Sequence, residues 1–278
     1  MDWTFTEGQV WDTVGADTST TQATSIPDSN TPHTKGSWTE LTASLARTCA
    51  GFWFNLNNNV SGPDQLLMDI GVGASGSEQV ILSNVYLKWG GSHDLGEYVY
   101  IPLTIPAGTR VTARCQTRQA ISTSDPWCEI IFEAKGLICD QGLSTSETFG
   151  ATTSNTTGVV IDTGATPHAK GAWVQLTSGL GRDARALVLC VAMDMDNSTL
   201  TTRWLIDIAV GASGSEQIIL PNILFSLDGS GVGQMRPGFY GPIPVEIKAG
   251  TRIAARGQAT ATISQTQRSF QVVGIAFS

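Results

Sequence analysis

Charged side chains are scarce in this sequence. Of its 278 residues only 14% are Asp, Glu, Lys or Arg, well below the roughly 25% of an ordinary soluble domain. The 16 basic residues are outnumbered by 24 acidic ones, which gives a net charge of −8. A protein that neutralises phosphates needs clustered Lys and Arg, and here they are scattered. We therefore expect no nucleic-acid partner.

Two further absences concern membranes and export. No apolar run approaches the ~20 residues that cross a bilayer, so we expect no membrane span. The start of the chain, Met1-Asp2-Trp3-Thr4, shows no basic stretch followed by an apolar one, which predicts that it is not a secretory signal. We expect synthesis in a cytoplasm, with the final location left open.

The cysteines show no C-x-x-C pair and no zinc-ligand spacing. Their odd number leaves at least one unpaired within a monomer. We expect buried thiols, with an intermolecular disulfide as the alternative. The five are Cys49, Cys115, Cys128, Cys139 and Cys190.

What the sequence does contain is Thr, Ser, Gly and apolar residues. Hydrophobic residues make up 41%, including eight Trp and nine Phe, and glycine is frequent, with 30 residues. This content is too apolar for a disordered chain, and it suits β-strands joined by tight turns better than helices.

Internal self-similarity reveals how the chain is organised. Three sequence blocks recur in the same order, at offsets that grow from 135 to 142 as loops lengthen. They are 32–38 with 167–173, 69–79 with 207–217, and 107–110 with 249–252. We predict two tandem copies of one domain, at 1–140 and 141–278. The junction near 136–146 is short, so the copies should pack against each other.

Each copy reads as successive strands. Residues 38–41 and 173–176 alternate apolar and polar, the period of a half-buried strand. Residues 49–54 and 187–193 are predicted to be continuously buried strands. Gly, Ser and Asn turns separate seven or eight such strands per copy. The predicted fold is all-β: two tandem antiparallel β-sandwich domains, jelly-roll-like.

Histidine is a common catalytic group, and this sequence contains three. His33 and His168 occupy the same repeat position, but no nucleophile or carboxylate recurs beside them. We interpret both as turn residues opening the first core strand, with a polar pair for binding as the alternative. His93 has no counterpart in the second copy, so it cannot serve a shared site.

The carboxylates that recur are Asp69/Asp207 and Glu78/Glu216. Paired carboxylates can hydrolyse glycosides when held ~5–10 Å apart, yet nothing in the sequence indicates that spacing. Arginines recur on a neighbouring strand, so we predict an ion-paired strut. They are Arg110/Arg252 and Arg114/Arg256.

No metal or cofactor site is predicted either. The Asp194–Asn197 segment could supply oxygens for calcium, but amides replace its carboxylates at 55–59, so a turn is the better interpretation. Gly71, Gly73 and Gly76 mimic a dinucleotide fingerprint without the helix that it requires. We expect no catalytic residues, no cofactor and no metal, and therefore not an enzyme.

Some of the repeated blocks resemble uncharacterised structural proteins of tailed bacteriophages. They are Lys35-Gly36-Ser37-Trp38, the segment Asp69-Ile70-Gly71-Val72-Gly73-Ala74-Ser75-Gly76-Ser77-Glu78, and Ile105-Pro106-Ala107-Gly108-Thr109-Arg110-Val111-Thr112-Ala113-Arg114-Cys115. The resemblance covers most of the chain and brings no catalytic residues with it. It implies a virion protein, such as a capsid decoration (cement) protein or a tail-associated subunit. Its partners would then be other capsid or tail subunits, and a homo-oligomer is expected.

The alternative function is a carbohydrate- or receptor-binding module of a tail fibre or spike, with a host surface glycan as ligand. Aromatic residues flank the loop that differs most between the copies, 88–99 against 228–240, and variable loops on a fixed scaffold often carry recognition. Their other interpretation is packing at an interface. The candidate recognition residues are Trp89, His93, Tyr98, Tyr100, Phe239 and Tyr240.

Overall fold

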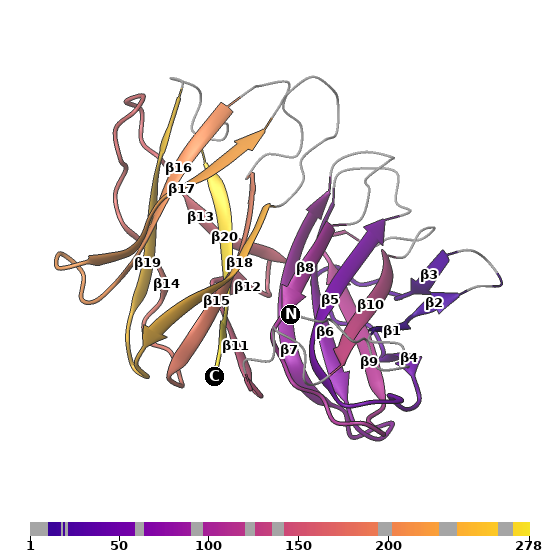
Figure 1. Ribbon diagram of the computed structural model, residues 1–278. Coiled ribbons are helices and arrows are strands. Elements are labelled where there is room, and N and C mark those ends of the chain that lie inside the picture. Colours follow the sequence, from indigo (N-terminus) through magenta and orange to yellow (C-terminus); the bar gives the residue numbers. More distant parts are fainter. Residues whose placement is uncertain are drawn as a thin grey trace, which may run out of the picture.

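The computed structural model describes residues 11–17, 19, 22–58, 64–89, 97–119, 126–134, 142–193, 202–227, 238–260 and 269–278. Within these residues all regular structure is β-strand, and every strand pairing is antiparallel (Figure 1). The strands form two sandwiches that lie side by side. The predicted all-β fold of tandem antiparallel sandwiches is confirmed. The predicted boundary at 140/141 falls outside the described residues.

The first sandwich is built from the first ten strands. They are β1 (Trp11–Val14), β2 (Ala16–Asp17), β3 (Gln22–Ser25), β4 (Thr39–Thr42), β5 (Cys49–Asn58), β6 (Asp64–Val72), β7 (Gln79–Trp89), β8 (Glu97–Ile101), β9 (Val111–Thr117) and β10 (Pro126–Ala134).

The second sandwich repeats them in order. Its strands are β11 (Ser146–Phe149), β12 (Ala151–Thr152), β13 (Thr157–Ile161), β14 (Val174–Thr177), β15 (Ala184–Met193), β16 (Thr202–Val210), β17 (Gln217–Leu227), β18 (Gly238–Ile247), β19 (Ile253–Ala259) and β20 (Phe270–Phe277).

Each sandwich has a six-stranded and a four-stranded sheet. In the first copy the orders are β2-β3-β10-β5-β8, with β1 also on β10, and β4-β9-β6-β7. The second copy has β12-β13-β20-β15-β18, with β11 on β20, and β14-β19-β16-β17. From β3 to β10 each successive strand lies in the opposite sheet, except that β6 and β7 are neighbours in one sheet, which is the jelly-roll arrangement.

The outermost part of each six-stranded sheet is broken into three short strands, so the structure has more strands than the seven or eight predicted. The break after β1 falls at Gly15 and its repeat equivalent after β11 at Gly150, with φ of 79° and 78°. A positive φ of this size strains any residue with a Cβ, which explains glycine at both places.

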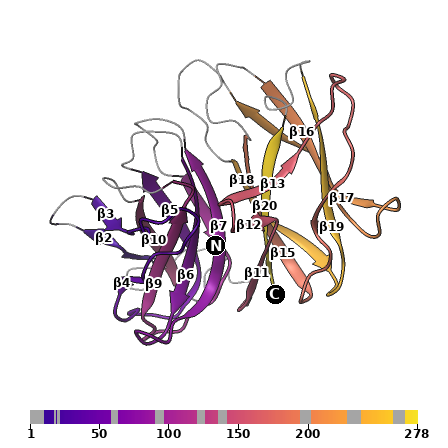
Figure 2. The ribbon, with the colours of Figure 1, turned by 180° about the vertical axis from the view of Figure 1, so that it is seen from behind.

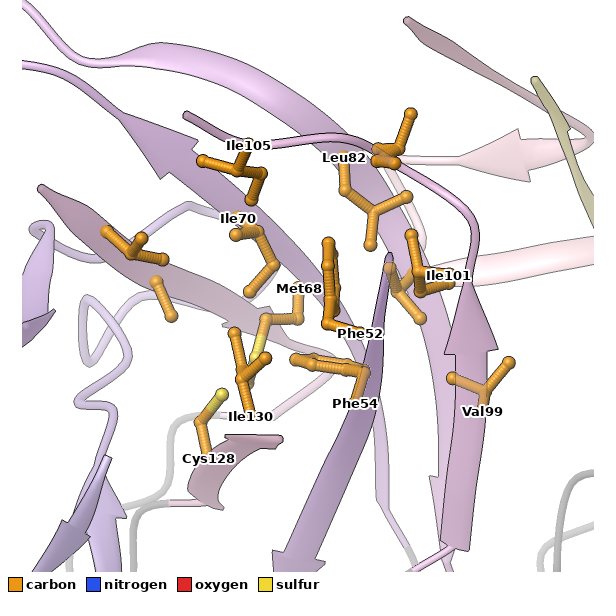
Figure 3. Packing of buried hydrophobic residues seen from close by; sticks show 14 of the residues in the cluster. Phe52, Phe54, Met68, Ile70, Leu82, Val99, Ile101, Ile105, Cys128 and Ile130 are labelled. Carbon is orange, nitrogen blue, oxygen red and sulfur yellow. The ribbon is translucent and has the colours of Figure 1, made fainter. Parts of the chain in front are cut away.

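The core of the first sandwich lies between its two sheets. Phe52 and Phe54 of β5 meet Met68 and Ile70 of β6 there (Figure 3). The prediction that residues 49–54 are continuously buried is wrong at Trp53, which is 39% exposed. Successive side chains of a strand point to opposite faces, so Trp53 points to the outer face of this sheet while Phe52 and Phe54 point into the core.

The matching strand of the second copy behaves differently. The described side chains from Leu187 to Ala192 are all buried, as predicted, and so is every side chain of β20. These two strands are covered on both faces, because the outer face of their sheet packs against the first copy. Figure 1 shows β7 and β8 on the side of the first sandwich that faces the second, and Figure 2 shows β7 there from behind.

Candidate interaction surface

A buried aspartate in each copy holds two cations. Asp69 lies on β6, and its side chain contacts the Lys35 amine at 2.7 Å and Arg114 Nε at 2.9 Å. In the second copy Asp207 contacts Lys170 at 2.7 Å and Arg256 at 3.0 Å. Each also accepts a backbone N–H across the neighbouring strand pair, from Asn84 or Asn222. The predicted ion-paired strut is confirmed.

The pKa shifts of the strut residues agree with this geometry. Burial raises the pKa of the Asp207 carboxyl, but hydrogen bonds from Lys170, the Asn222 N–H and Arg256 outweigh it and hold the pKa below its ordinary value. On the other side, burial lowers the pKa of the Lys35 amine against the opposing effect of Asp69. A permanently paired carboxylate of this kind serves as scaffold, because it has no free oxygen to act as an acid or base.

The recurring tryptophan completes the strut. Arg114 lies 4.3 Å from the ring centre of Trp38, and Arg256 lies 4.4 Å from that of Trp173. A second ion pair repeats beside it, Arg110 with Glu78 at 3.0 Å and Arg252 with Glu216 at 3.1 Å. The repeated residues singled out in the sequence thus build the fold. The lysines were not recognised as part of the strut, although Lys35 and Lys170 recur at one position.

The contact between the copies is apolar at its centre. Four side chains on the outer face of the second copy's six-stranded sheet complete the core of the first copy along the edge between β7 and β8. They belong to β15 and β20: Ala186, Val188, Ile275 and Phe277. Beside them Leu67 and Tyr86 of the first copy pack with Cys190, Ala192 and Val273. The first core is therefore not closed by its own copy alone.

Polar anchors surround this apolar centre. Gln116 Nε2 donates to the Thr153 carbonyl at 2.7 Å and to Thr156 Oγ1 at 2.9 Å. His33 Nδ1 lies 2.9 Å from the same Thr156 hydroxyl. The turn interpretation of His33 also fits, since its φ is 59°. Thr153 and Thr156 lie in the hairpin between β12 and β13, so this hairpin docks on the first copy.

Strand β11 adds a second set of anchors on β7. Ser146 Oγ donates to the Ile81 carbonyl at 2.6 Å, and Thr148 Oγ1 donates to the Ser83 carbonyl. Both acceptors are backbone oxygens of β7, and the Ser83 hydroxyl also donates to Thr148 Oγ1 at 3.2 Å. The short connection between the copies is therefore accompanied by tight packing, as predicted.

The surface that the first copy uses for this contact is repeated, uncovered, on the second. Tyr86 is fully buried by the contact, whereas its repeat equivalent Leu224 is 56% exposed. Four apolar side chains along the first copy's open edge are buried, and their equivalents are only partly buried. The pairs are Leu82 with Leu220, Val85 with Ile223, Ile101 with Ile243, and Leu103 with Val245.

At one neighbouring repeat position the exposure of the side chain is the same in both copies. Val80 is 43% exposed in the first copy, and its equivalent Ile218 is 45% exposed in the second. The difference at Tyr86 and Leu224 therefore comes from the covering copy and not from a general difference between the two sandwiches. We call this set the second-copy edge, in which Leu224 is exposed and the other side chains are partly buried: Leu205, Leu220, Ile223, Leu224, Ile243 and Val245.

The first copy presents a different exposed apolar surface, the outer face of its six-stranded sheet. Trp53 and Tyr98 are 39% and 50% exposed there. Tyr100 lies beside Trp53, with ring centres 5.2 Å apart, and its ring crosses Gly51, where a Cβ would collide with the hydroxyl. We call Trp53, Tyr98, Tyr100 and Ile131 the first-copy face.

The four candidate recognition residues whose side chains the structure describes do not gather at one site. Tyr98 is exposed and Tyr100 is buried beside it, both on β8. Phe239 packs at the contact between the copies, and Tyr240 lies beside the second-copy edge, where its hydroxyl donates to the Leu224 carbonyl at 2.7 Å. The side chain of Trp89 and all of His93 lie outside the described residues, as do residues 90–96 and 228–237 of the variable loop.

Sequence reasoning missed Trp53, because its strand looked continuously buried. The signal that could have found it is the comparison of copies. Position 53 is Trp in the first copy, and the equivalent residue on the covered sheet is Val188. A large aromatic residue in place of a smaller aliphatic one indicates that the two outer faces have different neighbours.

Metal sites, membrane spans and cysteine chemistry concern the described part of the chain in turn. No group of three or more His, Cys, Asp or Glu there could hold a metal ion. No helix in that part could span a membrane. Four cysteines are buried thiols, and Cys139 lies outside the described residues. The four are Cys49, Cys115, Cys128 and Cys190.

Comparisons with known proteins give only weak likenesses. No protein-family profile and no curated protein matches the chain. A solved structure of PNGF-II is 8% identical with a TM-score of 0.44, over 97% of this chain and 65% of that one. The chain therefore spans slightly less than two thirds of that protein's length.

Two other solved structures are similar at lower scores. The tandem CBM22-1–CBM22-2 domains of Xyn10C from Paenibacillus barcinonensis are 11% identical with a TM-score of 0.27, over 87% of this chain and 82% of that one. The T13 viral particle of IBDV is 11% identical with a TM-score of 0.20, over 84% and 56%. At these scores the likenesses carry no argument about function.

Proposed function

We propose that this chain is a non-enzymatic structural component of a tailed-phage particle, a capsid decoration or tail-associated subunit that assembles with other virion proteins. The observation that carries the proposal is the second-copy edge. The same surface in the first copy is buried under a β-sheet, and in the second copy it remains exposed around Leu224. Exposed apolar surface of this kind marks a protein contact.

The recurring charged residues give a second argument for the same proposal. The carboxylates present in both copies are neutralised by lysine and arginine, and their role in the fold accounts for their recurrence. What distinguishes the copies is which surfaces are covered. A chain whose repeated chemistry is structural, and whose copies differ in their exposed faces, suits assembly in a particle.

Binding to particles tests the proposal. Purified chain should co-sediment with particles of its own phage from which it has been removed. Leu224→Asp should reduce the bound fraction, while Ile218→Asp, on the neighbouring position exposed in both copies, should bind like the unmodified chain. Binding that is absent, or equally strong in both variants, would contradict a contact through this edge.

The second candidate function is recognition of a host surface glycan by the first-copy face. Exposed Trp and Tyr side chains on a sheet provide flat apolar surfaces of the kind that stack on rings, and Trp53 and Tyr98 are such residues. A glycan array tests this function. Specific binding that is lost in Trp53→Ala and Tyr98→Ala, and retained in Leu224→Asp, would favour it over the structural role.

A further inference from the structure

The two exposed apolar surfaces are the two halves of a contact that the chain already makes once. Within the chain, the outer face of the second copy's six-stranded sheet covers the first-copy edge between β7 and β8. The half that remains free on the second copy is the second-copy edge. The half that remains free on the first copy is the first-copy face. A second copy of this chain can therefore offer the face that the edge lacks.

The polar anchors of the internal contact recur in the free halves. His33 and Gln116, which hold the docking hairpin, correspond to His168 and Gln258 on the second copy. His168 is exposed and Gln258 is partly exposed, in contrast to the buried Gln116. The receptor positions for a hairpin are thus present on the second copy as well.

The hairpin itself recurs on the first copy. β2 and β3 pair as β12 and β13 do. The Thr148 anchor on β11 likewise corresponds to Thr13 on β1, whose side chain is exposed.

The residue at the centre of the contact changes from polar to apolar between the copies. Tyr86 donates to Gln271 in the internal contact. Its repeat equivalent on the second-copy edge is Leu224, which has no hydroxyl to satisfy, so an apolar surface is a sufficient partner for it.

We propose that this chain associates head to tail with further copies of itself, the first-copy face of one chain covering the second-copy edge of the next. The contact between chains then repeats the contact within the chain, so that sandwiches stack in a regular series. Such a heterologous contact closes into a ring if its rotation allows and otherwise continues as a filament. This self-association gives the proposed virion protein one partner, a further copy of the same chain. It rests on the proposed function only for the location of the assembly in a particle.

Sedimentation velocity of the purified full chain over a wide range of concentrations tests the proposal. The unmodified chain should form species larger than a monomer as concentration rises. Leu224→Asp on the edge and Trp53→Asp on the face should each weaken association roughly tenfold or more, the cost expected for an anchor at the centre of a contact. Ile218→Asp is the matched control and should associate normally. Circular dichroism should show that all three variants are folded.

Mixing distinguishes a head-to-tail contact from a symmetric one. The Leu224→Asp chain keeps an intact face and the Trp53→Asp chain keeps an intact edge, so an equal mixture should form a dimer although neither variant does so alone. A symmetric contact between two edges would instead leave Trp53→Asp fully dimeric by itself. That result would overturn the proposal.

Failure of the inference and failure of the proposed function give different results. An unmodified chain that stays monomeric at every concentration, yet binds particles, overturns self-association and leaves the structural role intact. A chain that forms the predicted mixed dimer but never binds particles supports the self-association and overturns the virion role.

Discussion

The hydroxyl of Tyr86 in the first sandwich donates a hydrogen bond of 2.5 Å to Oε1 of Gln271 in the second. Both residues are buried, and the same oxygen accepts the Gly158 N–H at 3.2 Å. A buried polar group that loses its partner carries the full cost of its removal from water. The two sandwiches are therefore held together by a specific contact, and each stabilises the other.

Replacing Tyr86 by Phe tests this relationship. The hydroxyl is lost without a change of shape, so the variant should lower the free energy of unfolding by about 1–3 kcal/mol. Urea unfolding measures the effect. Tyr98→Phe is the control, because its side chain is half exposed, and should change little. Equal effects in the two variants would mean that the contact between the copies contributes nothing to stability.

The buried strut should be far more sensitive than a surface ion pair. Asp207→Ala leaves Lys170 and Arg256 without their shared carboxylate, which should cost about 3–5 kcal/mol. Asp183→Ala removes the exposed partner of Lys248 and should leave the unfolding midpoint nearly unchanged. Thermal or urea unfolding compares them. A similar small change in both would contradict the strut as a stabilising element.

Acid should destabilise the fold through the same carboxylate. The pKa of Asp207 is lowered in the folded chain, so between that value and the unfolded value of about 3.9 the unfolded chain binds more protons. The stabilisation is complete above about pH 5 and is lost as pH falls through the folded-state pKa. Unfolding midpoints measured from neutral pH downward should fall less steeply for Asp207→Asn. Parallel curves would contradict this assignment.

Thiol labelling tests the predicted state of the cysteines. Burial raises the pKa of the Cys49 thiol to about 11, and Cys115, Cys128 and Cys190 are buried too. Since the thiolate is the reactive form, these four should resist a maleimide in the native chain and react after denaturation. Rapid native labelling of any of the four, identified by peptide mass spectrometry, would contradict their burial.

The sequence predicted the architecture well because the chain contains two copies of one domain, which can be compared with each other. Blocks such as 69–79 and 207–217 located the shared strands, and an aspartate within an apolar strand pointed to an ion pair with arginine. Asp69 and Arg114 do form that pair. The pattern did not identify Lys35 as its second cation, since the lysine reaches Asp69 from a distant turn.

The sequence alone could not predict which outer surfaces of the two sandwiches are buried. Leu67 and Leu205 are the same residue at the same repeat position, yet one is fully buried and the other partly exposed. Only the placement of the second sandwich on the first decides between them. For the same reason Trp53 was expected in a core and lies on an open face.

The composition of gradient-purified particles tests the central claim most directly. If the chain is the proposed virion protein, quantitative peptide mass spectrometry of tailed-phage particles assembled in its presence should find it in a fixed ratio to a capsid or tail subunit. The ratio should fall when Leu224→Asp replaces the natural chain and persist with Ile218→Asp. A chain that is missing from intact particles and remains in the soluble fraction of the infected cell would contradict the structural role.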